Sequence, residues 1–202
     1  MIIGPKYKIA RRLGAPIFEK TQTQKYALHL ERRGKSKKFS KPKSEFGLQM
    51  NEKQKARFSY GISEKQFSGY VKEALLKKAI NTPETIFQFL ELRLDNAIYR
   101  LGFSPTRSGA RQMVSHGHIS VNGRRVNTPS RRLKIGDKLT IAERSLKKPL
   151  FATIDEKIKN AAMPSWLKID AASKTAEVQG MPVHVKTENM FDLNAVIEFY
   201  SR

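Results

Sequence analysis

The chain has 202 residues, of which 39 are lysine or arginine and 18 are aspartate or glutamate, so its formal net charge is +21. That charge is too high for an ordinary enzyme, and a hydrophobic share of 39% is too high for a fully disordered chain. The sequence contains no cysteine, which excludes disulfides and cysteine-ligated zinc. No apolar run approaches the roughly 18 residues of a membrane span.

Most of the positive charge lies in two segments, residues 1–50 and residues 92–150. Each segment holds 13 basic and 3 acidic side chains, whereas the rest of the chain is nearly neutral. Two basic segments joined by a balanced scaffold are typical of a protein that contacts a polyanion at two places.

Residues 1–50 are expected to form a basic N-terminal extension. They combine short glycine and proline clusters with the basic run at 32–38 and show little hydrophobic periodicity. Two alternatives are open: a disordered tail, or an extension that becomes ordered by packing or against RNA. We expect this extension to be mobile in the free protein.

From residue 51 to residue 91 the signals are helical. Ser63 and Gln66 form a capping box, and Thr82 and Pro83 are suited to an N-cap and a first helical position. Apolar residues recur at the spacing of one helix face: Phe67, Tyr70, Val71, Ala74 and Leu75. This segment is therefore predicted to be a packed helical domain.

The segment 90–126 is the most informative stretch, because it predicts a helix, a loop, a second helix and a hairpin. The core face of the first helix is expected to hold Leu90, Leu94, Ala97, Ile98 and Leu101. Gly102 is expected to end this helix, and Thr106 to cap the second.

Arginines gather along one margin of these two helices. Arg93, Asn96 and Arg100 share an arc of the first helix, and the polar side of the second holds Arg107, Ser108, Arg111 and Ser115. Asp95, expected on the other side of the first helix, is the only acid from residue 92 to residue 127. The bland alternative is a solvated face, but such a face usually mixes charges. Unrelieved positive charge predicts a bound anion.

Downstream, alternating residues and turn signals predict short strands. Ile119 and Val121 precede an Asn122-Gly123 hairpin turn, which would pair Val121 with Arg124. Further strands are expected at 138–141, 167–170 and 176–178. The predicted fold class is α+β, a small antiparallel sheet with helices on one side. The apolar residues in 192–202 are expected to return to a core.

The remaining motifs predict neither a metal nor catalysis. His116-Gly117-His118 lacks a cysteine or a nearby carboxylate to complete a ligand set, so His116 is instead a candidate contact to phosphate or ribose. No nucleophile, base and orienting acid stand in a recognisable arrangement, and no glycine-rich phosphate loop follows a strand. We therefore expect no cofactor.

These motifs resemble a known family. The segment 90–126 is similar to the RNA-binding module named after the fourth protein of the small ribosomal subunit, through Leu90-Glu91, Arg93-Leu94, Ile98-Tyr99-Arg100, Thr106, Ala110-Arg111 and Met113-Val114. The likeness extends over nearly the full length through Gly4-Pro5-Lys6, Arg11-Arg12-Leu13-Gly14, residues 51–70 and the closing stretch from Ile197. The chain thus resembles the small-subunit ribosomal protein four family. It departs from the many relatives that carry a zinc site near the N-terminus.

If the apolar residues in 192–202 dock on the helices of residues 51–91, the charge distribution and helical signals predict a domain organisation with an insertion. The basic extension would span residues 1–50, and a helical domain would span residues 51–91 and be completed by residues 181–202. The RNA-binding module with its antiparallel sheet would be inserted between these parts, at residues 92–180.

The resemblance implies a structural protein rather than an enzyme. Such a protein binds 16S rRNA at a junction in the 5′ domain, nucleates subunit assembly and supports translation near the point where mRNA enters. Its neighbours would be small-subunit proteins three and five and the mRNA, with no membrane partner. The expected location is the cytoplasm, in the small ribosomal subunit, with the plastid stroma as the alternative. The alternative function is that of an RNA-targeting protein in RNA modification or ribosome rescue.

The candidate rRNA contacts are basic and polar side chains from both basic segments and the start of the helical domain. For Lys53, Lys55 and Arg57, the resemblance favours phosphate contacts over plain surface charges. The complete set is Lys6, Arg11, Arg12, Lys53, Lys55, Arg57, Arg93, Asn96, Arg100, Thr106, Arg107, Ser108, Arg111, Ser115, His116, Asn122, Arg124 and Arg125.

Overall fold

The computed structural model describes most of the chain and divides it into two compact units. The described residues are 3–34, 42–77, 81–152, 154, 158, 163–170, 173–185 and 189–201. The first unit comprises residues 1–86 and 185–202, and the second comprises residues 87–184. The expected division into an extension, a helical domain and an inserted module stays a prediction.

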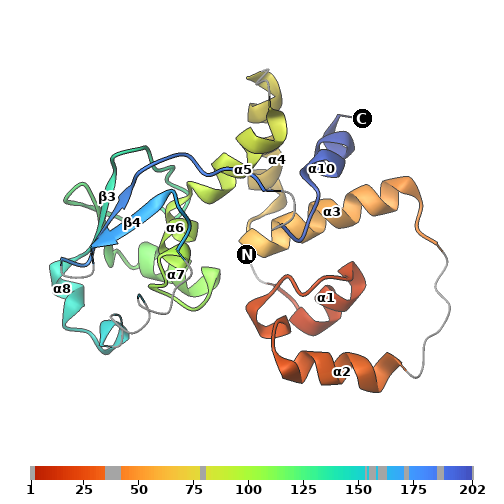
Figure 1. Cartoon of the computed structure of the whole chain (residues 1–202), viewed down its shortest axis with the longest axis horizontal. Helices are drawn as coiled ribbons and strands as arrows, with labels where there is room; N and C mark the ends of the chain where they lie inside the picture. Colours follow the sequence, from red (N-terminus) through yellow and green to blue (C-terminus); the bar gives the residue numbers. More distant parts are fainter. Residues whose placement is uncertain are drawn as a thin grey trace. The chain divides into compact units, whose positions relative to one another are not determined.

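The N-terminal part of the first unit contains helices where we expected little regular structure. Helix α1 (Lys6–Leu13), the 3-10 turn η1 (Glu19–Thr21) and helix α2 (Gln24–Gly34) follow one another (Figure 1). They enclose a small apolar cluster: Ala10, Leu13, Ile17, Phe18 and Tyr26, with Phe58 packed against it. Helix α1 also packs Tyr7 and Ile9 against this cluster, but its eight residues are too short a window for a hydrophobic period to stand out along the sequence.

The rest of the first unit is a packed helical arrangement. Helix α3 (Glu45–Tyr60) ends at Gly61 in the left-handed conformation, and helix α4 (Glu64–Leu76) begins at Ser63, whose Oγ accepts a hydrogen bond from the Gln66 amide. Helix α10 (Leu193–Tyr200) lies alongside α3 and also contacts α4 (Figure 1). Residues from both ends of the chain therefore share one core.

Helix α5 (Thr82–Glu91) begins one residue earlier than its sequence signals suggested. The side chain of Asn81, rather than that of Thr82, accepts a hydrogen bond from the backbone amide of Glu84. Asparagine is among the best N-cap residues, so it takes the cap and leaves Thr82 in the first turn.

The first helix of the segment 90–126 is interrupted where we expected it to be continuous. Helix α5 ends at Glu91, Arg93 is extended, and helix α6 (Leu94–Arg100) starts after it. Arg93 forms a β-bridge with Arg132, and the Leu133 amide donates to the carbonyl of Leu92. These long-range hydrogen bonds compete with the helix and break it between α5 and α6.

The following elements match the sequence expectations closely. Thr106 caps helix α7 (Arg107–Ser115) by accepting a hydrogen bond from the Gly109 amide. Strands β1 (Ile119–Val121) and β2 (Arg124–Val126) form a hairpin in which Val121 pairs with Arg124. Asn122 and Gly123 both have positive φ angles, 52° and 75°, as the favoured two-residue hairpin turn requires.

The sheet is antiparallel and has the strand order β2-β1-β3-β5-β4. Its other strands are β3 (Lys138–Ile141), β4 (Leu167–Asp170) and β5 (Thr175–Val178), with helix α8 (Glu143–Leu146) and the turn η2 (Pro149–Phe151) after β3. One apolar core joins the sheet to α6 and α7, which lie beside it (Figure 1). The predicted α+β class is confirmed.

Candidate nucleic-acid interface

Two arginines of the second unit share one buried carboxylate. Asp95 accepts two hydrogen bonds from Arg93, to Oδ1 at 2.9 Å and to Oδ2 at 2.8 Å. Arg111, which reaches across from α7, donates to Oδ2 of the same carboxylate at 2.8 Å. Only 2% of Arg93 and 2% of Asp95 is exposed, so this ion pair belongs to the interior.

A second buried acid organises the remaining arginines of α6 and α7. Arg100 donates to both carboxylate oxygens of Glu91, at 2.8 and 3.0 Å, and Asn96 donates to Oε2 at 2.9 Å. Asn96 in turn accepts a hydrogen bond from Arg107, whose guanidinium also lies over the ring of Tyr99 at 4.3 Å. The polar side chains on this margin therefore form a connected network.

This network corrects two sequence expectations. Asp95 does not lie on the opposite side from the arginines, because the break at Arg93 turns the side chains of Arg93 and Asp95 towards each other. Arg93 and Asn96 are buried rather than displayed. Glu91 lies just before the stretch 92–127, in which Asp95 is the only acid, and it supplies the second counter-charge.

The arginine margin still carries an excess of positive charge. We use this name for Arg100, Arg107 and Arg111, each of which is partly exposed. Arg100 and Arg111 are held by carboxylates that are nearly inaccessible to solvent, with 1% exposure for Glu91 and 3% for the Asp95 side chain. Arg107 is held by the side-chain oxygen of Asn96. A guanidinium has five N–H donors, so an arginine can contact more than one acceptor at a time, as Arg100 does with both oxygens of Glu91. Thr106 is occupied as a cap, whereas Ser108 and Ser115 are exposed beside the margin.

Lys53, Lys55 and Arg57 have partners within the first unit. Lys53 is 7% exposed, bonds to Glu64 at 2.9 Å and lies 4.3 Å from the ring centre of Phe199. Arg57 donates to Gln54 and lies 3.6 Å from Glu64, while Lys55 pairs with Glu52 at 2.6 Å. Lys53 and Arg57 link α3 to its neighbours and Lys55 pairs within α3, which differs from their expected display towards phosphate.

Glu64 is the centre of that cluster. Tyr200 of α10 donates a hydrogen bond to its Oε1 at 2.6 Å. Burial raises the pKa of Glu64, but the hydrogen bonds from Tyr200 and Lys53 outweigh this effect and leave its pKa lowered. Burial, followed by the bond to Glu64, raises the pKa of Tyr200. The cluster therefore attaches the C-terminal helix to α3 and α4.

The candidate residues of α1 lie on the surface. Arg11 and Arg12 are exposed, and the ammonium of Lys6 lies 5.6 Å from the ring centre of Phe18. The two arginines occupy the last turn of α1, where positive charge complements the helix dipole.

The hairpin residues divide into structural and displayed groups. Asn122 donates to Asp137 and accepts from the Lys138 amide, both at 2.8 Å, so it secures the turn. Arg124 is exposed. Arg125 donates to the backbone carbonyl of His116 at 2.9 Å and so links the hairpin to the end of α7.

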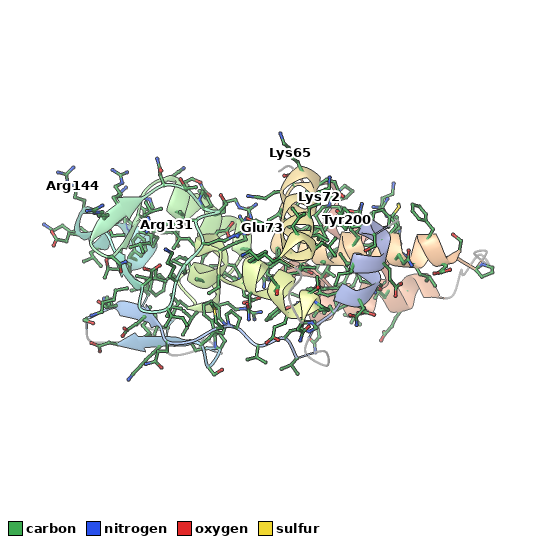
Figure 2. All side chains as sticks on the ribbon, turned by 90° about the horizontal axis from the view of Figure 1, so that it is seen from above. Lys65, Lys72, Glu73, Arg131, Arg144 and Tyr200 are labelled. Carbon is green, nitrogen blue, oxygen red and sulfur yellow. The ribbon has the colours of Figure 1, made fainter. Side chains whose placement is uncertain are left out.

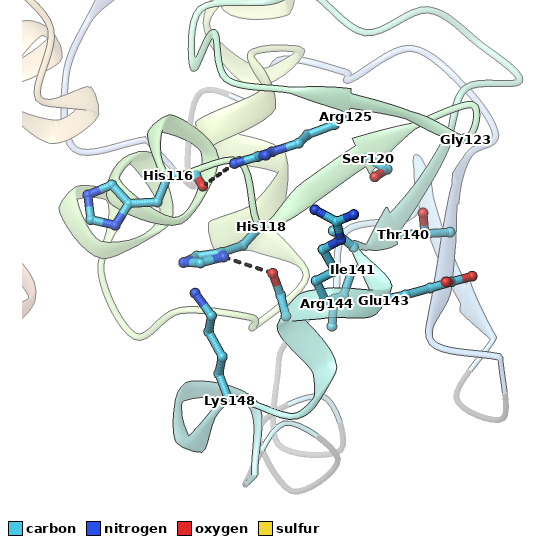
Figure 3. Close-up of a pocket in the computed structure, with 13 residues that line it drawn as sticks. His116, His118, Ser120, Gly123, Arg125, Thr140, Ile141, Glu143, Arg144 and Lys148 are labelled. Atoms are coloured by element: carbon cyan, nitrogen blue, oxygen red, sulfur yellow. Dashed lines mark hydrogen bonds between the residues drawn. The ribbon is translucent and has the colours of Figure 1, made fainter.

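A pocket of about 570 Å³ lies beside this link, between the hairpin and α8 (Figure 3). Its walls include His116, His118 and Arg125 from one side and Glu143, Arg144, Ser145 and Lys148 from the other. His118 Nδ1 lies 2.9 Å from Ser145 Oγ. Burial, followed by the charges of Lys148, His116 and Arg125, lowers the pKa of His118, which favours the neutral imidazole at pH 7.

Sequence reasoning missed the contribution of α8 to this pocket. Arg144 and Lys148 follow β3 by only a few residues, and a basic run after a strand reads as ordinary surface charge. In the described part of the chain, no group of histidines and carboxylates is arranged to hold a metal ion. None of the helices in that part has the length and hydropathy that a membrane span needs.

A small antiparallel sheet with two helices beside it and arginines along their margin defines a basic module of the RNA-binding class. Comparisons with known families agree. Residues 92–139 match the family model described as "S4 domain", and residues 1–91 match "Ribosomal protein S4/S9 N-terminal domain".

Full-length relatives extend this match. The chain is 37% identical to the small ribosomal subunit protein uS4 of Akkermansia muciniphila over 204 residues, which covers 98% of each chain. It is 38% identical to that of Chlorobaculum tepidum over 206 residues, and 39% identical to that of Amoebophilus asiaticus over 202 residues. The chain therefore belongs to the uS4 family of small-subunit ribosomal proteins, and the predicted resemblance is confirmed. Members of this family are structural constituents of the ribosome rather than enzymes.

Proposed function

We propose that this chain binds 16S rRNA at a junction in the 5′ domain. There it would nucleate assembly of the small subunit, beside proteins three and five, and support translation near the point where mRNA enters. Family membership and a net charge of +21 support this proposal. Folded RNA is a suitable ligand, because a basic surface reads the shape and the phosphates of an A-form helix rather than its bases.

The observation that carries the proposal is the geometry of the arginine margin. Arg100, Arg107 and Arg111 are bonded to Glu91, Asn96 and Asp95 respectively. Holding a guanidinium in place before binding reduces the side-chain entropy that association would otherwise cost. A margin of this kind suits repeated phosphates, which need fixed spacing more than base contacts.

The proposed contacts also need to be divided by exposure. Arg93 and Asn96 are buried and would position the arginine margin. Lys53, Lys55 and Arg57 would help to hold the first unit together. The direct contacts would come from the displayed residues: Lys6, Arg11, Arg12, Arg100, Arg107, Ser108, Arg111, Ser115, His116, Arg124 and Arg125.

A salt titration with a 5′-domain fragment of 16S rRNA tests this assignment. We expect the double variant Arg107→Gln and Arg124→Gln to lower the magnitude of the log-log salt slope by about 1.5 to 2, because two phosphate contacts are lost. The matched control is Lys65→Gln with Lys72→Gln, which removes two exposed lysines from α4 (Figure 2). Equal slopes for all three proteins would contradict the assignment.

Reconstitution tests the role in assembly. Small subunits assembled in vitro from 16S rRNA without this chain should fail to incorporate proteins three and five in their normal proportion. Restoring the chain should restore both proteins, whereas the double variant Arg107→Gln, Arg124→Gln should do so only at higher concentration. Normal incorporation without the chain would refute the nucleating role.

A further inference from the structure

The pocket between the hairpin and α8 differs from a simple basic patch because it is concave. Its walls come from β1, β2, the end of β3 and α8, and it encloses about 570 Å³. Ligand pockets for small molecules begin at a few hundred Å³, so this volume can hold a nucleotide. It is much larger than one phosphate group requires.

The shape of the pocket selects among forms of RNA. The phosphates of an A-form duplex lie on a convex, continuous surface and its bases are stacked inside. An unpaired nucleotide can leave the stack and offer its phosphate, sugar and base together. A concave site of this size is therefore suited to an unpaired nucleotide rather than to a paired helix.

The chemistry of the walls fits the parts of a nucleotide. Arg125, Arg144 and Lys148 supply positive charge, and Figure 3 shows the carboxylate of Glu143 pointing away from His118 and Lys148. Among the described residues, neither Arg144 nor Lys148 has a carboxylate within ion-pair distance. Their ammonium and guanidinium groups can therefore take a phosphate without giving up an internal partner.

His116 supplies an exposed flat surface, whereas His118 is only 8% exposed. The rings of His116 and His118 stand edge to face, with centroids 5.9 Å apart, and His116 is exposed. His118 is held by Ser145, so its orientation is set before any ligand arrives. A base can stack on an exposed ring of this kind, and nearby hydroxyls of Ser120 and Thr140 can accept or donate hydrogen bonds.

We propose that this pocket binds one unpaired nucleotide of RNA, with Arg125, Arg144 and Lys148 around its phosphate and its base against the exposed ring of His116, beside His118. The inference rests on the proposed RNA-binding function and adds a site for single-stranded RNA to the arginine margin. An acidic peptide is the rival ligand. It is less well matched, because a carboxylate would leave the depth of the pocket and the imidazole faces unused.

The test uses histidine NMR signals of the full-length protein. A single-stranded RNA tetranucleotide should shift the imidazole signals of both His116 and His118, whereas a blunt RNA duplex of equal charge should leave His118 unshifted. An oligoglutamate peptide provides the arm for the rival ligand. Equal shifts with the duplex, or with the peptide alone, would overturn the proposal.

Two double variants then distinguish binding in the pocket from nonspecific electrostatic attraction of RNA. Arg144→Gln with Lys148→Gln should weaken tetranucleotide binding about tenfold, because two cationic contacts are removed. Arg131→Gln with Lys134→Gln removes two exposed charges elsewhere in the second unit and should change it less than about twofold. Figure 2 shows that Arg131 and Arg144 both project from this unit. Circular dichroism melting verifies that both variants fold, and an equal loss of binding in the two would overturn the proposal.

The outcomes also distinguish this inference from the proposed function. If Arg144→Gln with Lys148→Gln binds the tetranucleotide as tightly as the wild type, while Arg107→Gln with Arg124→Gln loses affinity for the 5′-domain fragment, the pocket is refuted and the function stands. If the wild type fails to bind that fragment but the tetranucleotide still shifts the histidines, the proposed function is refuted and the pocket stands.

Discussion

The arginine margin and the pocket are both basic, but they hold their charge in different ways. Arg100 and Arg111 of the margin are bound to carboxylates that are buried beneath them. In the pocket, Arg125 is bound only to a backbone carbonyl in the described part of the chain, and Arg144 and Lys148 point from a four-residue helix and the residues after it. One surface is anchored by buried acid, and the other is not.

The comparison of these two surfaces shows what a buried acid contributes to a binding surface. Burying Glu91 and Asp95 costs desolvation energy, so these ion pairs are weak evidence for added stability. Their effect is to fix the direction of each guanidinium, which suits a rigid ligand. Side chains without such partners can adapt to a flexible ligand, but they lose more side-chain entropy when they bind.

The largest expected effect comes from removing an anchor. Asp95→Asn removes the buried carboxylate that pairs with both Arg93 and Arg111, so the free energy of unfolding should fall by about 3 to 5 kcal/mol. Chemical denaturation followed by circular dichroism measures the change. Glu143→Gln is the matched control, because Glu143 is an exposed acid at the pocket, and it should change stability by less than about 0.5 kcal/mol. Equal effects would show that Asp95 is no anchor.

The next prediction compares two arginines directly. Arg100→Gln removes the guanidinium that donates to both carboxylate oxygens of Glu91, which is 1% exposed, and should cost about 1 to 3 kcal/mol of stability. Arg144→Gln removes an exposed guanidinium and should cost less than about 0.5 kcal/mol. Thermal melting of both variants measures this contrast, which would fail if Arg144→Gln were the more destabilising change.

A smaller effect is expected from glycines near the pocket. Gly117 and Gly123 have φ angles of 68° and 75°, so alanine at either position should cost about 1 kcal/mol of stability. A Cβ at Gly117 would also overlap the guanidinium of Arg125, whereas one at Gly123 would meet open space. Only Gly117→Ala should therefore weaken binding of the tetranucleotide. Equal tetranucleotide binding by both variants would show that Arg125 does not contribute to binding in the pocket.

The smallest expected effect is a pH dependence. The folded pKa of His118 lies below its ordinary value of 6.5, so the unfolded chain takes up a proton more readily. The stability contributed by neutral His118 is present above about pH 6.5 and is lost as the pH falls through the folded pKa. The variant His118→Gln should therefore lose less stability than the wild type between pH 7.5 and pH 5. Parallel pH profiles in urea denaturation would contradict this assignment.

Local sequence signals were enough for much of the fold. The cap at Thr106, the turn at Asn122-Gly123 and the pairing of Val121 with Arg124 lie where they were predicted. Each of these depends on residues close together in the chain, for which hydrogen-bonding side chains and left-handed conformations leave few alternatives. The motifs of the segment 90–126 indicated the RNA-binding module, and those at 4–6, 11–14, 51–70 and 197–202 indicated the family.

The tertiary structure alone decided how the charges are used. Arg93 is buried because Arg132, nearly forty residues later, interrupts the helix and turns Arg93 towards Asp95. Arg111 joins them from another helix, and Arg144 and Lys148 reach the pocket only because β3 pairs with β1. A helical pattern places residues on one element's surface, but burial and ion pairing depend on what other elements bring to that surface. The sequence therefore determined which residues carry charge, and packing determined which of them remain available to RNA.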